Sequence, residues 1–265
     1  MDRPVTARAA AAARPQAGAR RLRAWIDTVA LVAGILVLWQ ALYALAGEDA
    51  LSAPAETVRH LLAMMGEGDF WPHVQETFAA FIQALAIAWT GGLCIGVALG
   101  ANRLASEVFE PILVALYSIP KVTLYPVILL FFGLGMQAKV AFGAIHGIIP
   151  VAIFAMAAVR NIRPIFLKSA RAMRLTARQR VTGILIPATI PEIVTGFRIG
   201  FALTMLGTLI GEMFASQRGL GFLLIRSIER HDVKTIMAVA LLLFAVATLA
   251  SWLLLRLDKH LHHRA

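Results

Sequence analysis

The chain has little charge for its length and almost no cysteine. Only 15% of its 265 residues are charged, whereas 59% are hydrophobic. This composition excludes an ordinary soluble domain and is typical of an integral membrane protein. The one cysteine, Cys94, lies in an apolar run and cannot form a disulfide within the chain, so we expect it to be a small packing residue.

The sequence also lacks the motifs of common catalytic and nucleotide-binding sites. It has no Gly-x-x-x-x-Gly-Lys-Ser/Thr phosphate loop, no His-Glu-x-x-His, no cysteine pair and no Gly-x-Ser-x-Gly. His146 lies alone in an apolar span, where a polar residue at a helix bend is the expected role. A tail with His260, His262 and His263 is more often solvated than metal-binding. We therefore expect no catalytic residues, no metal site and no cofactor. If the function of this protein requires energy, we expect a partner to supply it.

Long apolar stretches predict an all-α membrane protein with about six transmembrane helices. Four stretches are free of charge, at 28–46, 77–101, 140–159 and 235–255. Two are interrupted: 111–134 contains Pro120, Lys121 and Pro126, and 199–215 contains Glu212. The first stretch also resembles a cleavable export signal, but it is longer than the core of such a signal and five more spans follow, which favours an uncleaved helix.

The distribution of charge predicts the orientation in the membrane. An even number of spans places both termini on one side, and both termini are basic. Positive residues concentrate on the cytoplasmic side, which explains the net charge of +10 without nucleic acid. The loop at 160–198 has many basic residues and one acid, Glu192, so it is also expected inside. The predicted organisation is a basic cytoplasmic tail at 1–27, a transmembrane domain at 28–256 and a cytoplasmic tail at 257–265.

The loop at 160–198 contains signals for short helices. Pro164 suits the first turn of a helix, which would place Phe166, Ala170 and Met173 on one face. Thr176 and Gln179 form a capping box that starts a second helix, which Pro187 is expected to end. Thr189 and Glu192 repeat the capping signal before the fifth span. Such a loop could anchor to anionic lipid or enter a groove on a partner, and composition alone does not separate the two.

At these residues the chain resembles the permease subunit of binding-protein-dependent ABC importers of the nitrate, sulfonate and taurine type. The resemblance runs from the first span to the last. It rests on segments 51–54, 118–121, 131–135, 198–200, 211–213 and 219–221, and on the spacing from 168–171 to Ile186-Pro187. Two residues depart from the family pattern: Lys168 stands where a glutamate is frequent, and Arg174 stands where glycine is usual.

The resemblance implies a type I importer fold in which two copies of this chain pair in the inner (plasma) membrane. Two ABC ATPase subunits would dock from the cytoplasm, and a periplasmic or lipid-anchored binding protein would deliver a small anion such as nitrate, taurine or a sulfonate. The residues implied at the ATPase-coupling loop are Lys168, Ser169, Ala170, Arg171, Ala172, Met173, Arg174 and Pro187. Those implied at an outer gate or turn are Glu212, Gly219 and Gly221. The alternative is an ion-coupled secondary transporter, for which Glu212 and the interrupted third span are the only hints.

Overall fold

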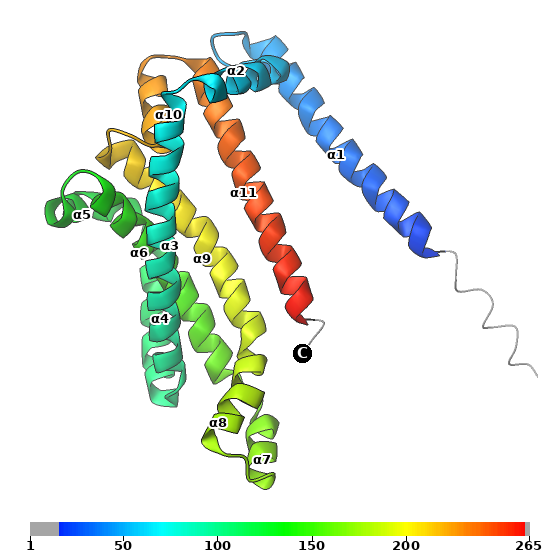
Figure 1. Cartoon of the computed structure of the whole chain (residues 1–265), viewed down its shortest axis with the longest axis vertical. Coiled ribbons are helices and arrows are strands. Elements are labelled where there is room, and N and C mark those ends of the chain that lie inside the picture. The colour runs from blue at the N-terminus through cyan, green and yellow to red at the C-terminus, as the bar shows by residue number, and fades with distance from the viewer. Residues whose placement is uncertain (1–15, 263–265) are drawn as a thin grey trace, which may run out of the picture. The chain divides into compact units, whose positions relative to one another are not determined.

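The computed structural model describes residues 16–262, including the side chains of residues 25–214 and 216–256. Every regular element in this part of the chain is helical (Figure 1). The chain forms two compact units, residues 1–59 and 60–265. The predicted class, an all-α membrane protein, is confirmed.

The first unit contains α1 (Gln16–Ala46) and the start of α2 (Pro54–Gly66). The apolar part of α1, Trp25–Ala46, is long enough to cross a membrane, and almost all of its side chains are exposed, as lipid contact requires. Helix α1 begins well before the predicted boundary at 28, because its first residues are rich in alanine, arginine and leucine, which favour helix. Residues 1–15 of the predicted tail lie outside the described residues.

The second unit contains the remaining helices (Figure 1). They are α3 (Phe70–Gly100), α4 (Arg103–Ser118), the 3-10 helix η1 (Lys121–Leu124), α5 (Tyr125–Phe132), α6 (Met136–Arg160), α7 (Pro164–Ala172), α8 (Ala177–Arg180), the π-helix η2 (Val181–Leu185), α9 (Ile186–Ala215), α10 (Leu220–Glu229) and α11 (Val233–His262). The side chains of the tail histidines lie outside the described residues.

Five helical stretches in the described part are long and apolar enough to cross a membrane, and a bent pair of helices makes a sixth if it counts as one span. That pair is α4 with η1 and α5, and its two halves meet at 85°. It takes the place of the predicted span 111–134 and begins earlier, at Arg103. The bend lies at Ile119 and Pro120, because Pro120 disfavours helical backbone at the residue before it and Ile119 is extended.

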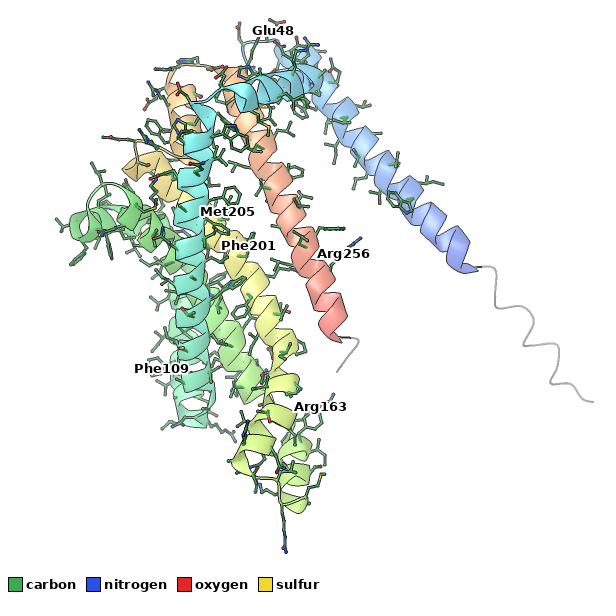
Figure 2. All side chains as sticks on the ribbon, in the orientation of Figure 1. Glu48, Phe109, Arg163, Phe201, Met205 and Arg256 are labelled. Atoms are coloured by element: carbon green, nitrogen blue, oxygen red, sulfur yellow. The ribbon has the colours of Figure 1, made fainter. Side chains whose placement is uncertain are left out.

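Helices α3, α6 and α9 form the centre of the second unit. Small residues allow α3 and α6 to approach closely: a Cβ atom added to Gly96 would lie 2.6 Å from the Cβ of Ala155 and 2.9 Å from the backbone nitrogen of Met156. Helix α9 contacts α3 through aromatic rings, with Phe201 (labelled in Figure 2) placed 5.0 Å from Phe81 between ring centroids. This core holds the two ends of the unit that carry the predicted site residues.

Candidate functional site

The predicted coupling loop, residues 160–198, lies at one end of the second unit, with Arg163 just before α7 (Figure 2). Pro164 is in the first turn of α7, as the sequence predicts. The capping box at Thr176 is also confirmed: its hydroxyl accepts from the Gln179 amide at 3.4 Å, and the Gln179 side chain accepts from the Thr176 amide at 2.9 Å. Local sequence therefore determines where both helices begin.

One of the predicted coupling residues at α7 is buried, and the others are exposed. Ala170 is completely buried inside the chain, so its methyl group is not available to a partner. Its small size serves the packing of the loop itself. The other predicted coupling residues are exposed: Lys168, Ser169, Arg171, Ala172, Met173, Arg174 and Pro187. Apolar residues at α7 are exposed too, with Phe166 at 41% and the C-cap residue Met173 at 69%.

Arg174 is not part of α7 but the first residue beyond its C-cap, Met173. Its φ angle is 51°, in the left-handed region. The Leu175 amide donates to the Ala170 carbonyl and the Arg174 amide donates to the Arg171 carbonyl, both at 3.0 Å. These two bonds form a Schellman motif, whose left-handed position favours glycine. Arg174, which stands where the family usually has glycine, thus occupies a position at which a side chain strains the backbone.

Replacing Arg174 by glycine is expected to stabilise the loop by about 1 kcal/mol, because the strain of a left-handed residue with a Cβ atom disappears. Resistance of the loop to limited proteolysis in membranes would measure the gain. Arg174→Ala is the matched control, since it removes the charge but keeps the Cβ atom. Equal protection in both variants would show that charge, not backbone strain, limits the stability of this turn.

The prediction that Pro187 ends the second helix is wrong, because helical backbone continues from Ala177 to Phe214. A π-turn precedes the proline, and in it the Ile186 amide donates to the carbonyl of Val181, five residues back. We attribute the continuity to this wider turn, which gives room to a ring that would clash in a regular α-helix. Thr189 is also no helix cap, since its hydroxyl donates to Leu185 and Ile186 carbonyls inside the continuous helix.

The predicted outer turn lies at the other end of the second unit, where Glu212 is completely buried. Its Oε2 atom accepts from the Thr77 hydroxyl at 2.8 Å and from the Gly221 amide at 2.9 Å. The Leu220 amide donates to the Thr77 hydroxyl at 2.8 Å. Glu212 therefore holds the turn before α10, as the sequence predicts, but through Thr77 and a backbone amide. None of the ion pairs found among the described residues joins Glu212 to Arg218 or Arg226.

Lys139 provides the positive charge beside Glu212. Its side chain is completely buried, and its Nζ atom lies 3.8 Å from Glu212 Oε1. The amine donates to Glu76 Oε1 at 2.9 Å and to the Arg218 carbonyl at 3.1 Å. One lysine thus joins α3, α6, α9 and the turn before α10. We call Glu76, Thr77, Lys139 and Glu212 the buried polar cluster.

Gly219 and Gly221 are necessary for this close approach. Gly219 has φ 127°, and a Cβ atom there would collide with the Glu212 carboxylate. A Cβ atom on Gly221 would lie 2.8 Å from the Cβ of Glu212. The structure therefore brings together all three residues predicted at the outer turn. The His73 ring extends the contact, because its Nδ1 atom accepts from the Gly219 amide at 3.1 Å.

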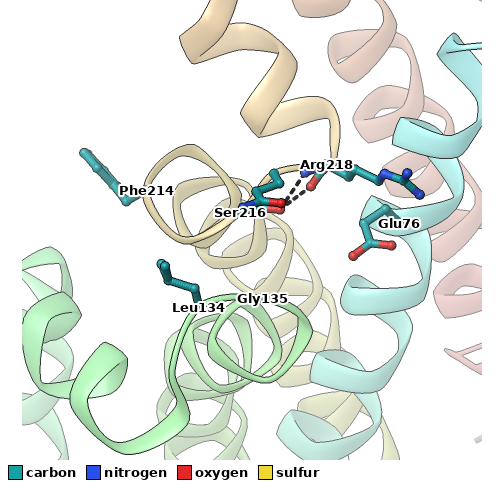
Figure 3. Close-up of a pocket in the computed structure, with 7 residues that line it drawn as sticks. Glu76, Leu134, Gly135, Phe214, Ser216 and Arg218 are labelled. Atoms are coloured by element: carbon teal, nitrogen blue, oxygen red, sulfur yellow. Dashed lines mark hydrogen bonds between the residues drawn. The ribbon is translucent and has the colours of Figure 1, made fainter.

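A cavity of about 600 Å³ lies next to the buried polar cluster. Figure 3 shows Glu76 and Arg218 close together on one side, and Leu134 and Phe214 on the other. Glu76 and Arg218 belong to segments that the buried polar cluster connects. A substitution in the cluster would therefore alter the wall of this cavity directly.

Four residues of this site do not follow from the sequence patterns: Lys139, Thr77, Glu76 and His73. Lys139 was placed outside the predicted span 140–159, although α6 begins at Met136. A single lysine at the edge of an apolar run is a usable signal, because such a charge needs a partner in the membrane. His146 is buried, and its hydrogen-bonding need is met within its own helix, with Nδ1 2.8 Å from the Phe142 carbonyl and the ring against Gly207.

Comparisons with known proteins agree with this architecture. The chain is 30% identical to the riboflavin transport system permease protein RibX of Chloroflexus aurantiacus, over 86% of this chain and 85% of RibX. It is 24% identical to the putative aliphatic sulfonates transport permease protein SsuC of Bacillus subtilis, over 89% of this chain and 86% of SsuC.

A solved structure of the MetNI methionine ABC transporter in inward facing conformations shares the fold. Its TM-score is 0.53 at 20% identity, and the match covers 77% of this chain and 94% of that chain. The model of the binding-protein-dependent transport system inner membrane component family matches residues 92–264, which include the predicted coupling loop and the predicted outer turn. The chain therefore belongs to that family, as an integral inner-membrane permease of ABC importers.

Proposed function

We propose that this chain forms the membrane path of an ATP-driven importer for a small anionic solute. Two copies pair in the membrane, two ABC ATPase subunits dock at the coupling loop, and a periplasmic or lipid-anchored binding protein delivers the solute. Family membership supports the importer and does not favour the ion-coupled alternative. The relative named for aliphatic sulfonates supports an anion as the solute.

The observation that carries the docking proposal is the exposed apolar surface of α7. Ile165, Phe166 and Met173 are 59%, 41% and 69% exposed, while Lys168 and Arg171 add positive charge on the same short helix. Only Ala170 of this helix is buried by the chain itself. Apolar anchors with a charged rim fit a groove on a partner subunit, so ATP-driven motion of that partner would move α7 and the continuous helix from Ala177.

Phe166→Glu and Met173→Glu are expected to abolish solute-stimulated ATP hydrolysis in the reconstituted complex, because each places a charge in a desolvated contact. Ile228→Glu is the matched control, since Ile228 is 47% exposed on α10 at the opposite end of the unit. Co-purification of the ATPase and its hydrolysis rate are the measurements. Normal stimulation in both α7 variants would exclude α7 as the docking helix.

The proposed orientation places both termini and the coupling loop in the cytoplasm. Single cysteines at Glu67 and Ala177, both exposed, should therefore label from opposite faces of the membrane in a Cys94→Ala background. Glu67→Cys is expected to react with an impermeant thiol reagent in intact cells, and Ala177→Cys only after the cells are opened. Reaction of both cysteines in intact cells would contradict the six-span arrangement.

A further inference from the structure

Lys121 stands at the sharpest break in the described membrane-spanning helices. Helix α4 ends at Ser118, η1 begins at Lys121, and the two halves of this span meet at 85°. The flanking sequence is apolar, with Val114 to Leu116 on one side and Val127 to Phe132 on the other. A permanent cation at such a position is costly in lipid and needs water, an anion or a backbone acceptor.

The contacts of the Lys121 amine leave its charge largely uncompensated. Its Nζ atom donates to the Tyr117 carbonyl at 3.0 Å and lies 5.2 Å from the centre of the Tyr117 ring. None of the ion pairs found among the described residues includes Lys121. An ammonium group has three donors, so two remain for other acceptors.

Lys139 offers a direct comparison within the same unit. Its amine is completely buried and is matched by Glu76, Glu212 and a backbone carbonyl. Because this amine is completely buried, a solute has no access to it. Lys121 is partly exposed and has one carbonyl and one ring as partners. Lys139 is held by contacts within the fold, whereas Lys121 can donate to an acceptor that comes and goes.

A second polar group, which has no hydrogen-bond partner, lies on the same bent segment. The Tyr125 hydroxyl is buried and has no hydrogen-bond partner in the described structure. Its ring is fixed by Phe142 and Phe214, at 5.8 and 5.2 Å between ring centroids. The break between α4 and α5 thus carries two donors, Lys121 and Tyr125, that intrachain contacts leave available.

We propose that Lys121 faces the aqueous translocation path and donates directly to the anionic group of the passing solute. This inference rests on the proposed importer function and adds the residue that selects for negative charge within the membrane. The contact is charge-assisted, and it is weak enough for release because backbone and ring partners remain when the solute leaves.

The first test measures whether position 121 is in water. Lys121→Cys in a Cys94→Ala background, assembled with its ATPase, is treated with 2-sulfonatoethyl methanethiosulfonate, a charged sulfonate that reacts with thiolates in water. Leu38→Cys is the control, because Leu38 is 60% exposed on the apolar helix α1. The cysteine at 121 is expected to react at least about tenfold faster. Equal, slow reaction at both positions would overturn the proposal.

The second test measures the contact with the solute. Lys121→Gln should raise the KM for taurine or nitrate uptake by about tenfold, while Lys121→Arg should stay near wild type. Treating the Lys121→Cys complex with 2-aminoethyl methanethiosulfonate restores a positive charge and should recover uptake, whereas the sulfonate reagent should not. A wild-type KM in Lys121→Gln would overturn this inference alone. A wild-type complex that imports neither anion would also refute the proposed solute class.

Discussion

Lys139→Met is expected to destabilise the protein by about 3–5 kcal/mol, because it leaves the buried Glu212 carboxylate, and the partly exposed Glu76 beside it, without their cation. Glu212 is completely buried, its Oε1 atom has no hydrogen-bond partner among the described residues, and the Lys139 amine lies 3.8 Å from that atom. The loss should appear as a lower midpoint of thermal unfolding in detergent. Uptake should fall as well, since the cluster holds the turn before α10.

The double variant Lys139→Met with Glu212→Gln tests whether charge is the cause. The glutamine oxygen can still accept from Thr77 and from the Gly221 amide, so much of the lost stability should return. A double-mutant cycle measures this coupling, which we expect to exceed about 1 kcal/mol. Simple addition of the two single effects would show that Lys139 contributes packing and not charge.

Gly96→Ala is expected to separate α3 from α6 and to lower stability by about 1–3 kcal/mol, as overpacking does. The new Cβ atom would meet the backbone of α6, including the Met156 nitrogen at 2.9 Å, so no side-chain rotation can relieve the clash. Thermal unfolding in detergent and the yield of folded protein are the measurements.

Gly91→Ala, on the same helix, is the matched control and should have the opposite sign. Its Cβ atom would meet only the Ile148 side chain, at 3.9 Å. Alanine favours helix over glycine by about 0.8–1 kcal/mol, so this variant should be neutral or slightly stabilised. If both variants behave alike, then helix propensity and not the α3–α6 contact determines the result.

Features that depend on local chemistry were predictable from the sequence. The apolar spans, the helix start at Pro164 and the capping box at Thr176 agree with the structure, because each depends on residues within a few positions of one another. The family resemblance is likewise carried by short motifs, each only a few residues long, that are spread along the chain. The three residues that the resemblance implies at an outer turn, Glu212, Gly219 and Gly221, lie together in the structure, and their placement at an outer gate stays a prediction.

Contacts between distant segments were decided only by tertiary structure. Lys139 pairs with residues 63 positions before it and 73 after it, a match that no local pattern encodes. The burial of Ala170 and the passage of a helix through Pro187 also depend on neighbouring turns that adapt to the fold. The reason is physical: hydropathy and capping act over one or two helical turns, whereas compensation of a charge inside a membrane requires whichever partner the packed helices bring within reach.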